Sequence, residues 1–192
     1  MYGKTTQMKH AILFVSVLML TLAAAAQVPA GVTVKTRFYL VRHAEKADNT
    51  SNPPLKNPEG LVRAGDLMRF LTFKKVKRIY VTEFLRTQMT ADSMHLQLHI
   101  DTVHYKAEEN GNDLFAKISA HSDFANKTIL IVGHSNTVPD YIKKLGVINY
   151  PQADIPGSQF DNIYKVYYKR SFLWFGRLKA YVTAMKYGVP TP

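Results

Sequence analysis

The 192-residue chain contains no cysteine, which excludes disulfide bonds, thiolate catalysis and zinc sites with cysteine ligands. It also shows no internal repeat and no low-complexity segment. Acidic residues are few: 14 Asp and Glu stand against 25 Lys and Arg, which gives a formal net charge of +11. This surplus favours anionic partners such as phosphate esters, nucleic acids or acidic lipids. Most basic residues are scattered, and the one compact cluster, 74–78, is interpreted as a solvated helix end and loop.

The main apolar run, residues 11–22, is shorter than the roughly 20 residues that a membrane span needs. It follows a basic start with Lys4 and Lys9 and precedes small residues, 23–26, that end in an Ala-x-Ala pattern. Residues 1–26 are therefore predicted to be a secretory signal peptide that is removed. The rest of the chain, 27–192, is expected to be a single exported domain, periplasmic or extracellular. An uncleaved membrane anchor is the less favoured alternative.

Strand-like and helix-like patterns alternate along most of the chain, which predicts a mostly parallel sheet with helices on both faces, a three-layer α/β sandwich. Strands are expected at 36–41, 78–81, 100–103 and 128–132, and helices at 60–73, 82–98 and 113–122. A further helix is expected after His134, with capping-box spacing at Thr137 and Asp140 and a C-cap at Gly146. Two late β-rich runs, 159–169 and 178–185, are predicted to form antiparallel edge strands.

Basic side chains follow three of the predicted strands. Arg42 and His43 end the first strand, Arg86 lies on the first turn of the helix after the second, and His134 follows the fourth. In open α/β sheets ligands bind beyond the carboxyl ends of the strands, so these four residues are expected to share one anion site. A structural ion pair, with Glu45 as the partner of Arg42 and His43, is the alternative for the first two.

Such a site suits attack on phosphorus. A neighbouring positive charge favours the neutral imidazole of His43, which leaves a ring nitrogen with a free lone pair. Arg42 and Arg86 can each hold phosphoryl oxygens through forked donors. His134, if protonated, adds a positive donor where negative charge accumulates, and the amino end of the helix that follows it also favours anions.

Three stretches, "LVRHAEK", "TEFLRTQMTA" and "ILIVGHSNT", occur in an order that resembles the histidine phosphatase superfamily, which has the phosphoglycerate-mutase-like fold. Ala44 stands where that family usually has glycine, and Thr82-Glu83 replaces its Ser-Pro. The resemblance implies that His43 is phosphorylated as a covalent intermediate and that Arg42, Arg86 and His134 form the phosphate pocket. The length of the chain resembles the compact phosphatases, including the small phosphohistidine phosphatases.

The proton donor is the residue that the motifs define least. In the larger acid phosphatase branch an aspartate follows the second histidine, whereas here Ser135 does. The compact branch has an acid between the second arginine and the second histidine, where "YKAEENGND" offers Glu108, Glu109 and Asp113. We expect Glu109 to be the donor, with Asp113 as the second choice, since Asp113 also suits the start of a helix.

The sequence therefore predicts an exported, metal-independent phosphatase that hydrolyses small phosphomonoesters and needs no cofactor, because arginines supply the positive charge. Two alternatives stay open: phosphoglycerate-mutase-type transfer, and non-catalytic binding of phosphate or a phosphorylated ligand. No nucleic-acid recognition motif and no membrane span of the mature chain are expected. The aromatic and basic stretch 164–181 could contact bases or lipid headgroups, but it is interpreted as a hairpin.

Overall fold

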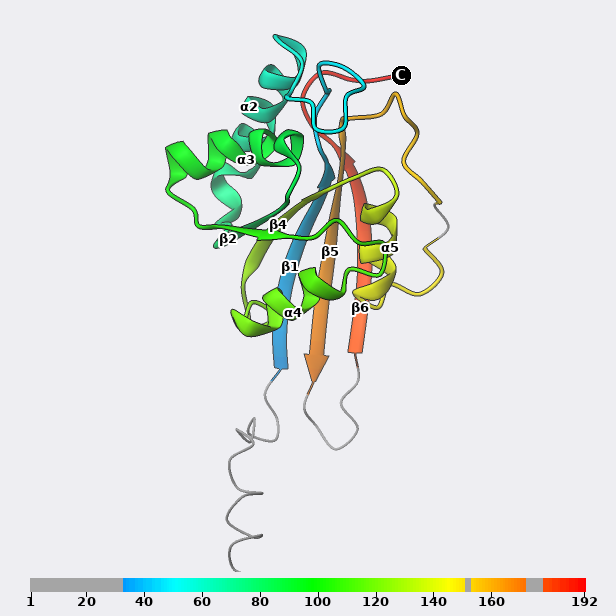
Figure 1. Ribbon diagram of the computed structural model, residues 1–192. Helices are drawn as coiled ribbons and strands as arrows, with labels where there is room; N and C mark the ends of the chain where they lie inside the picture. The colour runs from blue at the N-terminus through cyan, green and yellow to red at the C-terminus, as the bar shows by residue number, and fades with distance from the viewer. Residues whose placement is uncertain (1–32, 151–152, 172–177) are drawn as a thin grey trace, which may run out of the picture.

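The computed structural model describes residues 33–150, 153–171 and 178–192, so the predicted signal peptide lies outside the described residues. Six strands form one sheet in the order β3-β2-β4-β1-β5-β6 (Figure 1). The strands are β1 (Thr33–Arg42), β2 (Arg78–Thr82), β3 (Thr102–Tyr105), β4 (Thr128–Gly133), β5 (Asn162–Ser171) and β6 (Leu178–Lys186). The first four strands are mutually parallel, while β5 is antiparallel to β1 and β6 is antiparallel to β5. The expected antiparallel C-terminal edge is confirmed.

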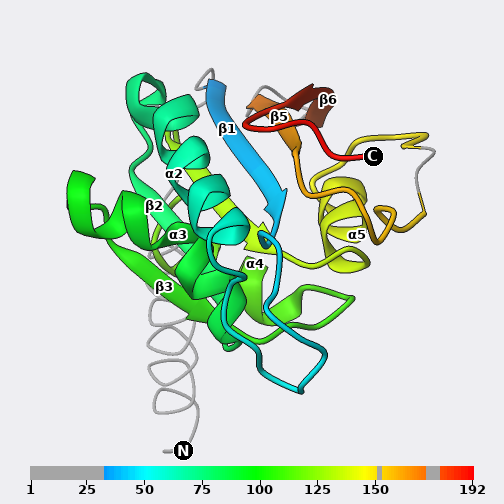
Figure 2. The same ribbon diagram turned by 90° about the horizontal axis from the view of Figure 1, so that it is seen from above.

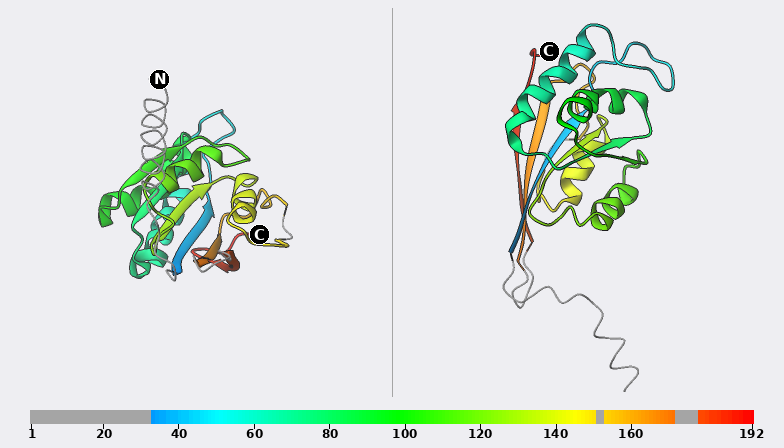
Figure 3. Two further views of the ribbon diagram at one scale, coloured as in Figure 1. Left: turned by 90° about the horizontal axis from the view of Figure 1, so that it is seen from below. Right: turned by 90° about the vertical axis from the view of Figure 1, so that its left-hand side faces the viewer.

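Helices cover both faces of the sheet, as Figures 2 and 3 show. They are α2 (Glu59–Leu71), α3 (Leu85–Leu98), α4 (Asn112–Ala120) and α5 (Thr137–Lys144), with a short 3-10 turn, η2 (Thr72–Lys74), after α2. Leu67 of α2 and Met94 of α3 belong to the core on one face, whereas Ile118 of α4 and Ile142 of α5 belong to the core on the other. The three-layer sandwich is therefore confirmed. Within the described ranges, no helix combines the length and the apolar character needed to cross a bilayer.

The central strands β1 and β4 are buried because both of their faces meet helices. Every residue of β4 is buried, and so are the last five residues of β1. This explains the continuous apolar runs in the sequence, because a strand that is buried on both faces does not need polar residues at alternate positions. By contrast, most residues of β6 are exposed, as an edge strand allows.

The start of α5 differs from the expected capping box. Asn136 precedes the helix, and Thr137 is its first residue. The Thr137 hydroxyl accepts the backbone N–H of His134 at 3.0 Å, and Asp140 forms an ion pair with Lys143 at 3.4 Å instead of capping the helix. The capping-box prediction is therefore wrong, and Thr137 instead fixes the turn that carries His134.

A buried carboxylate ties strand β2 to the loop before β4. Asp123, whose side chain is 1% exposed, accepts hydrogen bonds from Arg78 Nε at 2.8 Å, from Lys127 Nζ at 2.7 Å and from the Tyr80 hydroxyl at 2.8 Å. Two of the donors, Arg78 and Tyr80, lie on β2, and the third, Lys127, lies in the turn before β4. Buried charges are stable only when they are paired in this way.

Replacement of this carboxylate should destabilise the fold. Asp123→Asn removes the charge that Arg78 and Lys127 share, and we expect a loss of about 3 kcal/mol in the free energy of unfolding, measured by urea titration. Asp101 is the matched control, because it also pairs with Arg78, at 3.5 Å, but its side chain is 79% exposed. Asp101→Asn should lower stability by less than about 1 kcal/mol. Equal losses of stability in the two variants would show that burial of the Asp123 carboxylate does not determine its contribution.

Candidate active site

The four basic residues singled out in the sequence line one pocket at the carboxyl ends of β1, β2 and β4. The pocket has a volume of about 350 Å³. It is lined by Arg42, His43, Lys46, Phe84, Arg86, Ala107, His134, Ser135, Asn136 and Thr137. The parallel pairing of β1 with β4 places Arg42 opposite Gly133, so His43 and His134 both emerge just beyond this pair. Their rings lie 5.5 Å apart between centroids.

Arg42 is held in position from three sides. Its Nη1 donates to the backbone carbonyls of Pro156, Gly157 and Gln159 at 3.0, 3.0 and 3.1 Å. Its guanidinium lies over the ring of Phe160, 4.1 Å from the centroid. Its Nε is buried and has no hydrogen-bond partner. The side chain is therefore rigid, charged and still able to donate to an anion in the pocket.

Hydrogen bonds fix the tautomer of His43. Its Nδ1 lies 2.7 Å from the carbonyl oxygen of Ala44. A carbonyl only accepts, so Nδ1 must carry the proton and Nε2 must carry the lone pair. The backbone N–H of His43 donates to the carbonyl of Gly133 at 2.9 Å, which locks the end of β1 to the end of β4. The ring thus presents one unprotonated nitrogen on a rigid backbone.

Arg86 and a series of threonine hydroxyls give His134 the opposite tautomer, with its proton on Nε2. Arg86 Nη2 lies 3.5 Å from His134 Nδ1, and an arginine can only donate. The proton of His134 is therefore on Nε2, which lies 3.1 Å from the Thr82 hydroxyl. That hydroxyl contacts the Thr87 hydroxyl at 2.8 Å, and Thr87 in turn donates to the Phe84 carbonyl at 2.7 Å. The hydroxyl protons of Thr82 and Thr87 therefore each have an acceptor.

Arg86 completes the positive surface of the pocket from the first turn of α3. Its guanidinium lies 4.3 Å from the centroid of Phe84, and its Nε is buried without a hydrogen-bond partner, as in Arg42. Burial lowers the pKa of both arginines below their ordinary value, and the charge of Arg86 lowers that of Arg42 further. Both remain charged in water, because an arginine does not deprotonate in proteins.

Burial keeps both imidazoles neutral. Burial lowers the pKa of His43 to about 3. The hydrogen bond to Ala44 raises this pKa, whereas His134, Arg42 and Arg86 lower it further. Burial, followed by the charges of Arg86 and Arg42, lowers the pKa of His134 to about 4. His43 therefore has the neutral form that a nucleophile requires. His134 is also neutral at pH 7 in this arrangement, rather than the protonated donor considered from the sequence.

The two candidate proton donors occupy different surroundings. Glu109 does not itself line the pocket, but its Oε1 accepts a hydrogen bond at 3.3 Å from Nδ2 of Asn136, which does. Asp113 instead accepts from Lys117 Nζ and from the backbone N–H of Lys106, both at 2.8 Å. These bonds, with that of Lys117 first, lower the pKa of Asp113. Asp113 is therefore engaged with the start of α4 and does not line the pocket.

The residues next to the first motif have structural functions. Ala44 is completely buried, and its backbone N–H donates to the Thr90 hydroxyl at 2.9 Å. Its φ angle is not positive, so a side chain in place of glycine causes no backbone strain. Among the described residues, Glu45 forms no ion pair with Arg42 or His43 but pairs with the buried Arg63 of α2 at 2.7 Å. The alternative of a local ion pair is thus wrong.

Several pocket residues were not apparent from the sequence. Phe160 packs on Arg42 from a segment more than a hundred positions away, and Lys46, Phe84 and Asn136 line the pocket from loops. Lys46, Phe84 and Asn136 each lie within three residues of His43, Arg86 or His134, and this closeness is the signal that could have identified them. The position of Phe160 depends on how distant segments fold together.

Solved structures share this architecture. The protein assigned as phosphohistidine phosphatase SixA of Agrobacterium tumefaciens is 18% identical, with a TM-score of 0.53 over 83% of this chain and 100% of its own. Mycobacterial hydrolase 2 is 13% identical, with a TM-score of 0.58 over 82% of this chain and 94% of its own. A mycobacterial glucosyl-3-phosphoglycerate phosphatase is 12% identical, with a TM-score of 0.51 over 76% and 97%.

These similarities show that the chain has the phosphoglycerate-mutase-like fold, the fold of the histidine phosphatase superfamily. No model of a known protein family matches the sequence, and no curated protein matches it either. The fold inferred from the three sequence motifs is thus confirmed by structure alone.

The lowered histidine pKa values predict a specific dependence of stability on pH. In the unfolded chain both rings take up protons near their ordinary pKa of 6.5, whereas in the folded protein they do so only near 3 and 4. Between these values the unfolded state binds more protons, so stability must fall as the pH drops below 6.5. The expected slope is at most about 1.4 kcal/mol per pH unit for each histidine.

Urea titrations between pH 7 and pH 5 test this, since carboxylates titrate mainly below that window. The double variant His43→Gln/His134→Gln should lose much less stability over the same window than the wild type. The same pH dependence in both proteins would show that the two rings are not responsible.

Proposed function

We propose that the protein is a phosphatase of the histidine phosphatase type, which hydrolyses small phosphomonoesters through a phosphohistidine at His43. The observation that carries this proposal is the fixed tautomer of His43. Its Nε2 keeps a lone pair in a pocket that it shares with Arg42, Arg86 and His134. A neutral imidazole beside two arginine forks is suited to attack a phosphoryl group that the arginines hold.

The substrate phosphate is held by the two arginines. Among the described residues, neither Arg42 nor Arg86 forms an ion pair with a carboxylate, so a phosphoryl oxygen can accept from their guanidinium groups without competing with one. The negative charge of the phosphate also raises the affinity of His134 for a second proton, so that the ring gains a positive charge only when substrate is present. Lys46 at the pocket lining adds positive charge near the substrate.

The reaction then has two displacements on phosphorus. In the first, Nε2 of His43 forms a bond to phosphorus while the ester P–O bond breaks, and the leaving oxygen takes a proton from Glu109. In the second, water attacks phosphorus, the P–N bond breaks, and the water proton passes to the Glu109 carboxylate. Phosphate is released, and both residues return to their initial states.

Several observations support the wider proposal. The arginines supply the positive charge that Mg²⁺ supplies in other phosphoryl-transfer enzymes, so we propose that hydrolysis needs no metal. Proteins with this fold include a glucosyl-3-phosphoglycerate phosphatase, which supports a small phosphorylated substrate. The N-terminal sequence, residues 1–26, supports export to the periplasm or the exterior.

The direct test is a phosphatase assay on p-nitrophenyl phosphate in the presence of a chelator. His43→Gln should lower the rate by more than about 1,000-fold, because the nucleophile is lost. The matched control is His121→Gln, which changes an exposed histidine outside the pocket and should leave the rate unchanged. Full activity of His43→Gln would disprove the mechanism, and loss of wild-type activity with chelator would disprove metal independence.

If Glu109 is the proton donor, the loss of rate in Glu109→Gln must depend on the leaving group of the substrate. A nitrophenolate leaves without protonation, but an alkoxide does not, so Glu109→Gln should slow hydrolysis of an alkyl phosphate by about 100-fold and hardly affect p-nitrophenyl phosphate. Glu108→Gln is the control and should behave as wild type on both. If Asp113→Asn gives this selective loss and Glu109→Gln does not, the assignment of Glu109 is wrong.

A further inference from the structure

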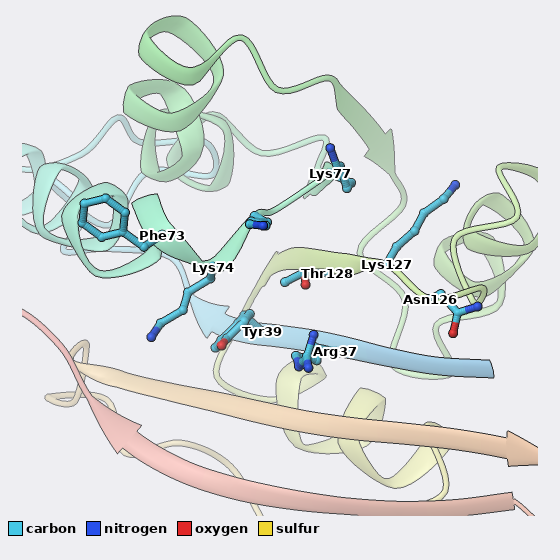
Figure 4. A pocket seen from close by; sticks show the side chains of 9 residues that line it. Arg37, Tyr39, Phe73, Lys74, Lys77, Asn126, Lys127 and Thr128 are labelled. Atoms are coloured by element: carbon cyan, nitrogen blue, oxygen red, sulfur yellow. The ribbon is translucent and has the colours of Figure 1, made fainter. Parts of the chain in front are cut away.

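A second pocket, of about 380 Å³, lies at the opposite end of β1 from the active site. It is lined by Arg37, Tyr39, Phe73, Lys74, Lys75, Lys77, Asn126, Lys127 and Thr128 (Figure 4). Arg37 pairs with Thr128 at the start of β4, whereas Arg42 pairs with Gly133 at its end. Five strand residues at about 3.3 Å each separate the two pockets by roughly 16 Å along β1. The nine lining residues include no histidine and no carboxylate, so this pocket is suited to hold an anion and not to hydrolyse it.

Four of the five cations of this pocket have no carboxylate partner in the part of the chain that the structure describes. Among the described residues, no Asp or Glu forms an ion pair with Arg37, Lys74, Lys75 or Lys77. Only Lys127 has a partner, Asp123, at 2.7 Å. Like charges gathered in one place repel one another and disfavour the fold, unless an anion binds among them. Lys74, Lys75 and Lys77 are exposed at the end of η2 and in the loop before β2, as the sequence interpretation of a solvated helix end and loop expected.

Neutral hydrogen-bond donors lie beside these charges. Figure 4 shows Arg37 and Tyr39 on the same side of β1, with Thr128 on the neighbouring strand. Tyr39 is buried, and burial raises the pKa of its hydroxyl although Arg37 acts in the opposite direction, so the group remains a donor. The Oδ1 of Asn126 accepts the backbone N–H of Lys35 at 2.8 Å, which leaves its amide nitrogen to donate elsewhere. An arginine fork with hydroxyl and amide donors is the set that recognises phosphate oxygens.

Phe73 distinguishes between the possible sources of a phosphate group. Its side chain lines the pocket and is 89% exposed, the highest value among the large hydrophobic residues described. Lys74 and Lys75 follow it directly in the sequence. A free phosphate ester gives no reason for an exposed aromatic ring at this position. A lipid does, because its headgroup meets the lysines while its acyl chains meet the ring.

We propose that this pocket binds the phosphate headgroup of an anionic phospholipid, with Phe73 in contact with the acyl chains. Arg37 and the lysines neutralise the phosphate, and Tyr39, Thr128 and Asn126 donate to its oxygens. A membrane at this end of the sheet lies away from the active site, so substrate access stays open. The surface is a peripheral contact and requires no spanning helix.

The test is calorimetric titration of the purified full chain with dioctanoyl phosphatidylglycerol below its micellar concentration, and with dioctanoyl phosphatidylcholine as the zwitterionic reference. The anionic lipid should bind more tightly than the reference. Lys74→Gln/Lys77→Gln should weaken its binding by about 30-fold, since each lysine contributes about tenfold or less near an anionic headgroup. Phe73→Ser should weaken it by about tenfold with no change in charge.

Lys56→Gln/Lys143→Gln is the matched control, because it removes the same charge from two exposed lysines that pair with Glu59 and Asp140. It should bind the anionic lipid as wild type does, and thermal melts should show all variants folded. An equal loss in this control would show attraction by net charge alone and overturn the site. A titration with pyrophosphate tests for a free phosphate ligand. If Lys74→Gln/Lys77→Gln weakens pyrophosphate binding while Phe73→Ser has no effect on lipid binding, the ligand is a free phosphate and the lipid assignment is wrong.

Discussion

The register between β1 and β4 is the constraint on which the candidate active site depends. Arg42 lies opposite Gly133 in this parallel pair, and the His43 N–H donates to the Gly133 carbonyl at 2.9 Å. Because of this register the two histidines leave neighbouring strands at the same level. A slip of one residue would turn each side chain of the strand to the other face of the sheet. The buried apolar residues of both strands, packed between two helical layers, hold the register in place.

The chemistry of the site follows from a conflict between burial and charge. Two arginines and two histidines share a small pocket, and burial makes a positive charge on either imidazole unfavourable. The arginines cannot release their protons, so the histidines remain neutral instead. This division leaves a free lone pair on His43 and, beside it, fixed positive charge, which is the combination that the proposed phosphoryl transfer requires. The Ala44 carbonyl, which accepts from His43 Nδ1, and the Arg86 guanidinium, which donates to His134 Nδ1, then decide which nitrogen of each ring carries the proton.

Much of this arrangement could be predicted from the sequence, for a physical reason. Strand ends are visible as apolar runs that stop at charged residues, and parallel strands end at one edge, so Arg42, His43, Arg86 and His134 could be brought together without a structure. Phe160 and the Glu45–Arg63 pair could not be predicted, because they depend on packing between distant segments. The Thr137–Asp140 spacing predicted a capping box that did not form, since Thr137 binds the His134 backbone instead. The basic pocket around Arg37 was missed because its residues come from three separate segments.

The central claim is that phosphorus becomes bonded to Nε2 of His43. The most direct measurement is to quench the enzyme during turnover of a radiolabelled phosphomonoester, digest it under alkaline conditions and locate the label by mass spectrometry. The account predicts an acid-labile, alkali-stable phosphate on the peptide that contains His43, and none in His43→Gln. Label on another residue, or turnover with no protein-bound phosphate even when the second displacement is slowed by rapid cooling, would contradict it.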